Sequence, residues 1–172
     1  MNSIFIPAKV IALIAVLSAL SNILSSSPFV IPFAVGSFNS GFHLAQLPIF
    51  ISGILAGPWV GFITGIIGGL YMSFSVEIPF IVGGLGILGF FSGIFSHKMR
   101  IKPIFSCILA WIINVPYVFI SDYIWFVSVR GMPSPVALAT VLTIILTLTV
   151  EVLIASGLIA IIIPYLKNYQ IG

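Results

Sequence analysis

Three acidic side chains and one arginine are the residues of this sequence whose chemistry most needs a reason. The acids are Glu77, Asp122 and Glu151, the base is Arg130, and each lies within or beside a long apolar segment. An ionised side chain at the centre of a bilayer costs about 2.5–3.5 kcal/mol even on the gentler scales, so intramembrane charges indicate a functional site. Because few bases are available to pair with the three acids, we expect these acids to contact a ligand.

Helical spacing places two of the acids on polar stripes. One stripe consists of Thr140, Thr143, Thr147 and Glu151, and the other of Trp111, Asn114, Val118, Asp122 and Trp125. Pro116 is expected to kink the helix that carries Asn114 and Asp122 and to free a backbone carbonyl there. Two polar stripes on neighbouring helices predict a shared interior cavity. The alternative is hydrogen bonding between helices without a ligand, at about 0.6 kcal/mol for each bond.

The predicted substrate-binding set extends to weaker candidates near the same end of the helices. His43 opens an apolar segment, where a histidine at the headgroup level is an equally good explanation. Trp125 fits an aromatic belt at the membrane surface, and Arg130 fits a headgroup anchor or a partner for one acid. The complete predicted set is Glu77, Asn114, Asp122, Trp125, Glu151, His43, Asn39 and Arg130.

The composition excludes a soluble protein. Of the 172 residues, 60% are hydrophobic and 5% are charged, and the mean hydropathy is +1.32. A soluble domain carries about 25% charged residues, so a cytosolic enzyme, a nucleic-acid binder and a disordered chain are all excluded. The single cysteine, Cys107, excludes a disulfide framework and a cysteine metal site. The class that remains is an all-α membrane protein, a single transmembrane domain over residues 1–172.

Six transmembrane helices in a compact bundle are expected from the lengths of the apolar runs, since about 20 residues span a bilayer. The predicted helices are Ala8–Leu24, Gly41–Ala56, Trp59–Phe74, Ile78–Ser96, Pro103–Phe126 and Pro135–Tyr165. The segment 25–40 is apolar but has no clean period, so we expect a loop that is packed over the helices or partly inserted.

The basic residues predict that both termini are cytoplasmic. With the N-terminus inside and six spans, five of the six lysines and arginines fall on the cytoplasmic side, and only Arg130 falls outside. Because lysine and arginine accumulate in short cytoplasmic loops, this orientation is favoured over its reverse. The three acids then lie in the outer half of the membrane or near its midplane.

Small residues form two further patterns. Ala8, Ala12, Ala15 and Ala19 share one face of the first helix. Such faces allow close contact between helices, either with a partner protein or within the same chain. Glycines recur at every fourth position from Gly53 to Gly69, interrupted by Pro58, and Gly89 and Gly93 form another pair. These glycines predict close internal packing of the second, third and fourth helices.

These features together resemble the S component of energy-coupling factor (ECF) transporters, the substrate-binding subunit of an ABC importer. The resemblance rests on the alanine stripe, the long apolar loop after it, and the run HLAQLPIFISGILAGPWVGFITGIIGGLY from His43 to Tyr71. Its most specific part is the pattern of Pro48, Gly53, Gly57, Pro58, Gly61 and Gly65. Six spans with both termini inside also agree with that family.

The resemblance implies a function and partners. An S component binds a small water-soluble vitamin or precursor from outside, does no chemistry on it and needs no cofactor. It joins a transmembrane coupling protein and two ATPases in a prokaryotic plasma membrane. The family's contact with the coupling protein would be Ala8, Ala12, Ala15 and Ala19, and the loop over residues 25–40 would close over the ligand. The nickel and cobalt members need a histidine after the first methionine, and Asn2 stands here, which disfavours a metal substrate.

Rival functions remain open at this point. Glu151 could be a proton or cation site of a self-sufficient secondary transporter, although no inverted repeat accompanies it. An intramembrane enzyme would need a nucleophile beside a base, and no such arrangement is evident. A structural subunit would leave the outer acids unexplained. The excess of acids over Arg130 in the outer half of the membrane favours a neutral or cationic heterocycle, such as thiamine or a pyrimidine precursor, over an anionic vitamin.

Overall fold

The computed structural model describes residues 7–35 and 38–167 as a bundle of helices with one small β-hairpin. The first part comprises α1 (Ala8–Leu24), a 3₁₀ turn (Ser27–Phe29), β1 (Ile31–Val35), β2 (Phe38–Phe42) and α2 (Gln46–Ala56). The middle comprises α3 (Pro58–Gly68), α4 (Leu70–Val76) and α5 (Ile81–Gly93), which continues as a π-helix, η2 (Ile94–Lys98). The last part comprises α6 (Pro103–Ile124), its π-helical extension η3 (Trp125–Val129), and α7 (Ser134–Lys167).

Within the described ranges, the predicted six-helix architecture is confirmed. Four helical segments are long and apolar enough to cross a membrane: Pro58–Val76, Ile81–Lys98, Pro103–Val129 and Ser134–Leu166. Two shorter apolar helices, Ala8–Leu24 and Gln46–Ala56, complete the bundle. Pro116 lies inside α6, as expected, and Pro164 lies inside α7 near its end.

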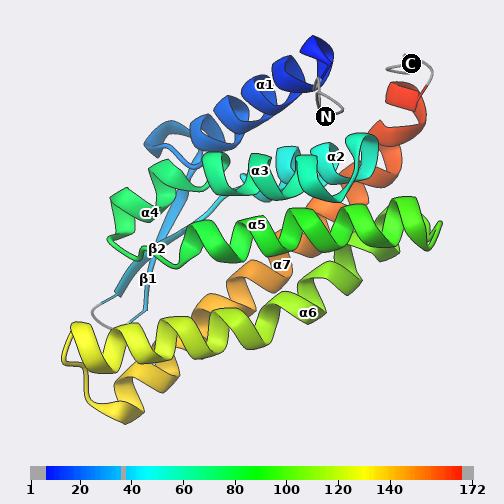
Figure 1. Ribbon diagram of the computed structural model, residues 1–172. Coiled ribbons are helices and arrows are strands. Elements are labelled where there is room, and N and C mark those ends of the chain that lie inside the picture. The colour runs from blue at the N-terminus through cyan, green and yellow to red at the C-terminus, as the bar shows by residue number, and fades with distance from the viewer. Residues whose placement is uncertain (1–6, 36–37, 168–172) are drawn as a thin grey trace, which may run out of the picture.

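The beginning of α1 and the end of α7 lie at the same end of the bundle (Figure 1). The turn between α5 and α6 lies at that end as well, and it carries the exposed residues Lys98, Arg100 and Lys102. The loop between α6 and α7, which carries Arg130, lies at the opposite end. The fold therefore separates the basic residues as the predicted orientation requires, and cytoplasmic termini remain a prediction.

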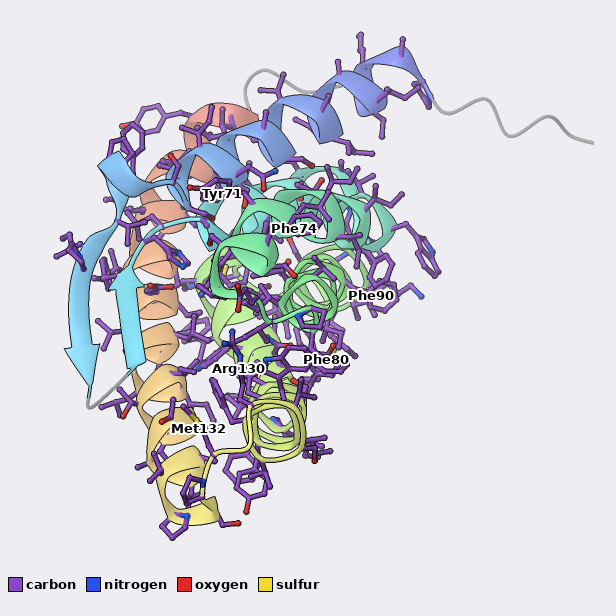
Figure 2. The ribbon with its side chains drawn as sticks, turned by 90° about the vertical axis from the view of Figure 1, so that its left-hand side faces the viewer. Tyr71, Phe74, Phe80, Phe90, Arg130 and Met132 are labelled. Atoms are coloured by element: carbon purple, nitrogen blue, oxygen red, sulfur yellow. The ribbon has the colours of Figure 1, made fainter. Side chains whose placement is uncertain are left out.

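The segment before α2 is where the predicted helix boundary is wrong. The second helix was expected from Gly41, but Gly41 belongs to β2 and α2 begins at Gln46. Strands β1 and β2 pair antiparallel, with Ile31 opposite Phe42, and lie beside α7 (Figure 2). Pro48 explains the late start of α2, because proline is tolerated in a helix's first turn, where its missing N–H has no partner to lose.

Glycines bring α2 and α3 into backbone contact with α5, which confirms the predicted internal packing. A Cβ atom added at Gly53 would lie 2.5 Å from the carbonyl oxygen of Gly89. At Gly93 it would lie 2.6 Å from the backbone of Pro58, and at Gly65 2.5 Å from the carbonyl carbon of Leu85. Because lipid gives helices no hydrophobic reason to associate, such close approach is a main source of their attraction.

Polar side chains attach α1 to the rest of the bundle. The hydroxyl of Ser21 donates to the carbonyl oxygen of Ala45 at 2.8 Å, and the amide of Asn22 donates to that of Ile67 at 3.0 Å. The alanine face points away from these contacts, since Ala8, Ala12, Ala15 and Ala19 are all exposed. This face is therefore not used for packing among the described residues.

Candidate functional site

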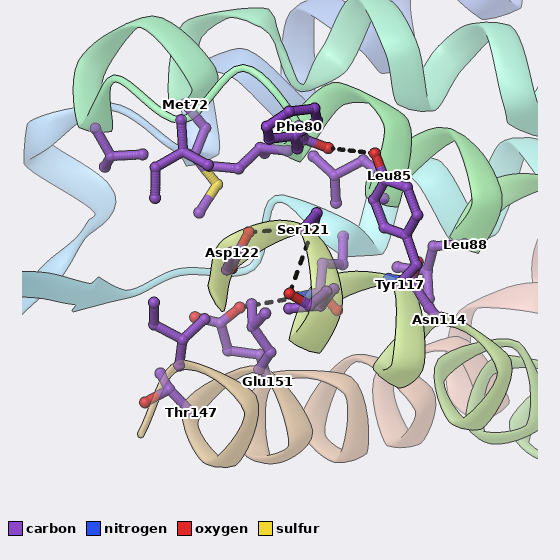
Figure 3. A pocket seen from close by; sticks show the side chains of 18 of the residues that line it. Met72, Phe80, Leu85, Leu88, Asn114, Tyr117, Ser121, Asp122, Thr147 and Glu151 are labelled. Atoms are coloured by element: carbon purple, nitrogen blue, oxygen red, sulfur yellow. Dashed lines mark hydrogen bonds between the residues drawn. The ribbon is translucent and has the colours of Figure 1, made fainter. Parts of the chain in front are cut away.

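A cavity opens between α4, α5, α6, α7 and the segment that leads into α2 (Figure 3). Its empty volume is about 780 Å³, a value that includes space open to solvent. The cavity lies in the half of the bundle away from the beginning of α1 and the end of α7. Four residues of the predicted set line it: His43, Asn114, Asp122 and Glu151.

The two predicted polar stripes meet at this cavity. Trp111, Asn114, Val118 and Asp122 reach it from α6, while Thr147 and Glu151 reach it from α7. The other threonines of the α7 stripe bond backward along their own helix, as Thr140 does by donating to the carbonyl oxygen of Val136 at 2.9 Å. The helical period therefore identified two of the walls.

Glu151 is fully buried and has partners within the chain. The backbone N–H of His43 donates to its Oε1 at 2.9 Å, and Nε2 of Gln46 donates to its Oε2 at 3.1 Å. Nδ1 of His43 lies 3.6 Å from Oε2. Burial lowers the pKa of His43, which lies in the connector between β2 and α2, to about 4, so its ring is neutral at pH 7. Glu151 thus joins α7 to the segment between the hairpin and α2 by hydrogen bonds.

Several buried polar atoms of the cavity residues make no hydrogen bond among the residues that the structure describes. These are Oδ1 of Asn114, Oε1 of Gln46 and both ring nitrogens of His43. The three residues concerned are at most 5% exposed. A buried polar group without a partner costs about 1–3 kcal/mol, so their gathering at one cavity indicates a place where a polar ligand binds.

The hydroxyl groups at the cavity use their hydrogens elsewhere. Tyr117 donates to the carbonyl oxygen of Phe80 at 3.1 Å, and Thr147 donates to that of Thr143 at 2.9 Å. Asp122 is buried, and the hydroxyl of Ser121 donates to its Oδ1 at 3.4 Å. Among the lining residues within the described ranges, none is a lysine or an arginine. The polar groups of the cavity therefore act mainly as hydrogen-bond acceptors.

Glu77 and Arg130 lie outside the cavity lining and pair with each other. The Arg130 Nη2 atom lies 2.6 Å from Oε2 of Glu77, and the two side chains are 41% and 71% exposed. Glu77 has a left-handed backbone, with φ of 58°, at the end of α4. The expectation that the three acids lack partners within the chain is therefore wrong for Glu77 and for Glu151.

Of the two remaining residues of the predicted set, Trp125 is not among the lining residues, and Asn39 cannot be placed by its side chain. The indole ring of Trp125 packs edge to face on Phe80, with ring centroids 5.9 Å apart. Its Nε1 is buried and finds no partner in the part of the chain that the structure describes. Asn39 belongs to β2, and its side chain is outside the described ones.

The cavity also includes residues that the predicted set omitted. Met72 and Val76 reach it from α4, Phe80 from the loop before α5, and Gln46 from the start of α2. The sequence does indicate Gln46 as a site residue, because it is a polar residue at the start of an apolar helix, one turn after His43. The contribution of α4 had no such signal, because its cavity residues are ordinary apolar ones.

The chain was compared with known families and solved structures. The family model of the S component of ECF-type riboflavin transporters matches residues 6–170. The fold is similar to that of the S component of a bacterial ECF transporter, at 20% identity and a TM-score of 0.67, covering 95% of this chain and 98% of that one. It is also similar to the S component for biotin of an ECF-type ABC transporter, at 20% identity and a TM-score of 0.61, covering 87% and 90%. No curated protein sequence matches the chain.

Proposed function

Because this chain belongs to the family of ECF-type riboflavin transporter S components, we propose that it binds riboflavin in the cavity between α4, α5, α6 and α7. As an S component it is the substrate-binding subunit of a transporter, a multi-pass membrane protein and not an enzyme. The observation that carries the choice of riboflavin is the family match over residues 6–170.

The apolar walls of the cavity suit the ring system of riboflavin. Phe80, Leu85 and Leu88 come from the α5 side, and Ile144 and Leu148 face them from α7. A flat tricyclic ring offers a large apolar surface, and ligand pockets bury most of such a surface against hydrophobic side chains. These residues would therefore supply most of the contact area.

The polar groups of the cavity suit the hydrogen-bond donors of riboflavin. Its ring carries one N–H group and its ribityl chain carries hydroxyl groups, whereas the molecule has no negative charge. Oδ1 of Asn114 and Oε1 of Gln46 are unpaired acceptors among the described residues. A neutral ligand with several donors would satisfy them, while an anion would meet Asp122 with no described cation in the lining. Riboflavin is also a neutral heterocycle, which is one of the ligand classes predicted from the acidic residues of the sequence.

The exposed alanine face of α1 supports a second proposal, which concerns a partner protein. We propose that Ala8, Ala12, Ala15 and Ala19 contact the transmembrane coupling protein, which joins two ATPases to the S component. All four are exposed although α1 packs on α2 and α3 by its other side. Small side chains allow another helix to approach the backbone closely.

The test is riboflavin binding by the purified protein. Flavin fluorescence, which tryptophan and tyrosine side chains quench at short range, gives the dissociation constant in a direct titration, because Trp111 and Tyr117 line the cavity. We expect tight binding that unlabelled biotin, the ligand of the S component with the similar fold, does not displace. Failure of riboflavin to bind, or displacement by biotin at comparable concentrations, would contradict the proposed substrate.

A further inference from the structure

The carboxylate of Glu151 does more than connect two segments, because its two bonds restrict the orientation of an amide group. Its Oε1 accepts from the backbone N–H of His43, and its Oε2 accepts from Nε2 of Gln46. Glu151 and Gln46 are both 1% exposed. Bulk water therefore does not compete for these bonds.

Both oxygens of Glu151 accept in these two bonds, whereas an amide side chain has a donor end and an acceptor end. With Oε2 of Glu151 beside it, the amide of Gln46 must turn its NH₂ group toward the carboxylate, because the reverse orientation would bring two acceptors together. Its oxygen is then the end left at the cavity wall, and Oε1 makes no hydrogen bond among the described residues.

We propose that Glu151 is a positioning residue that holds Gln46 as a hydrogen-bond acceptor for a donor of the ligand. This inference rests on the proposed function, since it treats the cavity as the riboflavin site. Glu151 does not need to touch the ligand in this arrangement. Its accepting Oε2 atom determines which end of the Gln46 amide the ligand meets, and so it selects for a ligand with an N–H or O–H group at that place.

Replacing Glu151 by glutamine tests the orientation directly. The backbone N–H of His43 still needs an acceptor, so the oxygen of the new amide takes the place of Oε1 and its NH₂ group faces Gln46. The Gln46 amide then turns its oxygen toward this donor and presents its own NH₂ group to the cavity. Glu151→Gln keeps the size of the side chain and inverts the polarity that the ligand meets.

The proposal predicts how the loss of affinity depends on the ligand. Every hydrogen-bond donor of riboflavin is either the ring N–H, which 3-methylriboflavin lacks, or a ribityl hydroxyl, which lumiflavin lacks. We expect Glu151→Gln to weaken riboflavin binding by about 10- to 100-fold, the range for leaving a buried polar group unpaired. One of the two analogues lacks the donor from which Oε1 of Gln46 accepts. For that analogue, Glu151→Gln should weaken binding by less than about threefold.

A merely structural role of Glu151, such as fixing the hairpin against α7, would not distinguish these ligands. An equal fold-loss for riboflavin, 3-methylriboflavin and lumiflavin would therefore overturn the proposal, and so would an unchanged riboflavin affinity. Failure of the unmodified protein to bind riboflavin would instead refute the proposed function. Titrating the unmodified protein with riboflavin therefore distinguishes failure of this proposal from failure of the proposed function.

A double-mutant cycle gives a second, independent measurement. Gln46→Met removes the amide at nearly constant size and leaves the bond between His43 and Glu151 available. If Glu151 acts through Gln46, adding Glu151→Gln to the Gln46→Met protein should cost less than about threefold in riboflavin affinity. Fully additive losses would overturn the proposal. Ser156→Ala, a change at a buried α7 residue that bonds to Leu153 and lies outside the cavity lining, is the matched control and should leave the affinity unchanged.

Discussion

Substituting Gly65 by alanine should loosen the contact between α3 and α5 and disturb the cavity behind it. A Cβ atom at Gly65 would lie 2.5 Å from the carbonyl carbon of Leu85 and 2.7 Å from the nitrogen of Gly86. Both are backbone atoms, so no side chain can rotate away. Since carbon atoms prefer separations of about 3.5–4.0 Å, the two helices must move apart by roughly 1 Å.

The magnitude follows from the cost of overpacking. Inserting a methyl group into a closely packed interface costs about 1–3 kcal/mol. For a chain of this size, each 1 kcal/mol lowers the melting temperature by about 2–4 °C, so Gly65→Ala should lower it by about 2–12 °C. Leu85 lines the cavity, and its displacement should weaken riboflavin binding in parallel.

The chain offers a matched control in Gly157 of α7. A Cβ atom there would meet nothing within 4 Å, and its backbone is helical. Gly157→Ala should raise stability by about 0.4–1 kcal/mol, because alanine is the better helix former and restricts the unfolded chain. Thermal unfolding in detergent, followed by the fluorescence of the tryptophans, measures both variants. Equal melting temperatures for Gly65→Ala and Gly157→Ala would refute the reasoning that α3 and α5 can approach closely only because Gly65 has no Cβ atom.

Further predictions concern the ligand, the partner and the orientation. Asn114→Leu should weaken riboflavin binding by about tenfold at unchanged melting temperature, because its Oδ1 has no described partner to lose; a large drop in melting temperature would contradict this. Ala12→Trp or Ala15→Trp should abolish uptake in proteoliposomes that contain the coupling protein and ATPases, while riboflavin binding by the isolated subunit persists; loss of both would place the stripe in internal packing. Reporter tags at either terminus should be accessible only from the cytoplasm, and an external signal would contradict the six-span orientation.

The length of the apolar runs made the six helices predictable, whereas the hairpin was not. A bilayer sets the number of residues for each span, so the runs in α5, α6 and α7 could be counted directly. Strands β1 and β2 carry no alternating pattern in their sequence, and their pairing depends on neighbours such as α7. Local composition cannot show that kind of dependence.

The partners of Glu77 and Glu151 were the part that sequence reasoning judged wrongly. Glu77 and Arg130 lie 53 positions apart, on loops that only the folded bundle brings together. Glu151 meets the backbone of His43 across 108 positions. Partners of this kind leave no local spacing signal. The acids in the outer half of the membrane outnumber Arg130, and this count suggested that the acids are unpaired. N–H donors can satisfy the oxygens of a buried carboxyl group without a base, as they do for Glu151.

The case of Trp125 shows how far a helical period can be trusted along one helix. Asn114 and Asp122 share a face of α6 and both line the cavity, as the spacing predicted. Trp125 belongs to the same stripe by counting, but the backbone changes from α-helix to π-helix at this residue. The backbone N–H of Trp125 still bonds to Ser121 as in an α-helix, so the residue lies at its counted position and only later residues are rotated by the π turn. Its indole packs on Phe80, a lining residue, while Trp125 itself is not among the lining residues, so the helical period gives the face of a side chain but not what that side chain contacts.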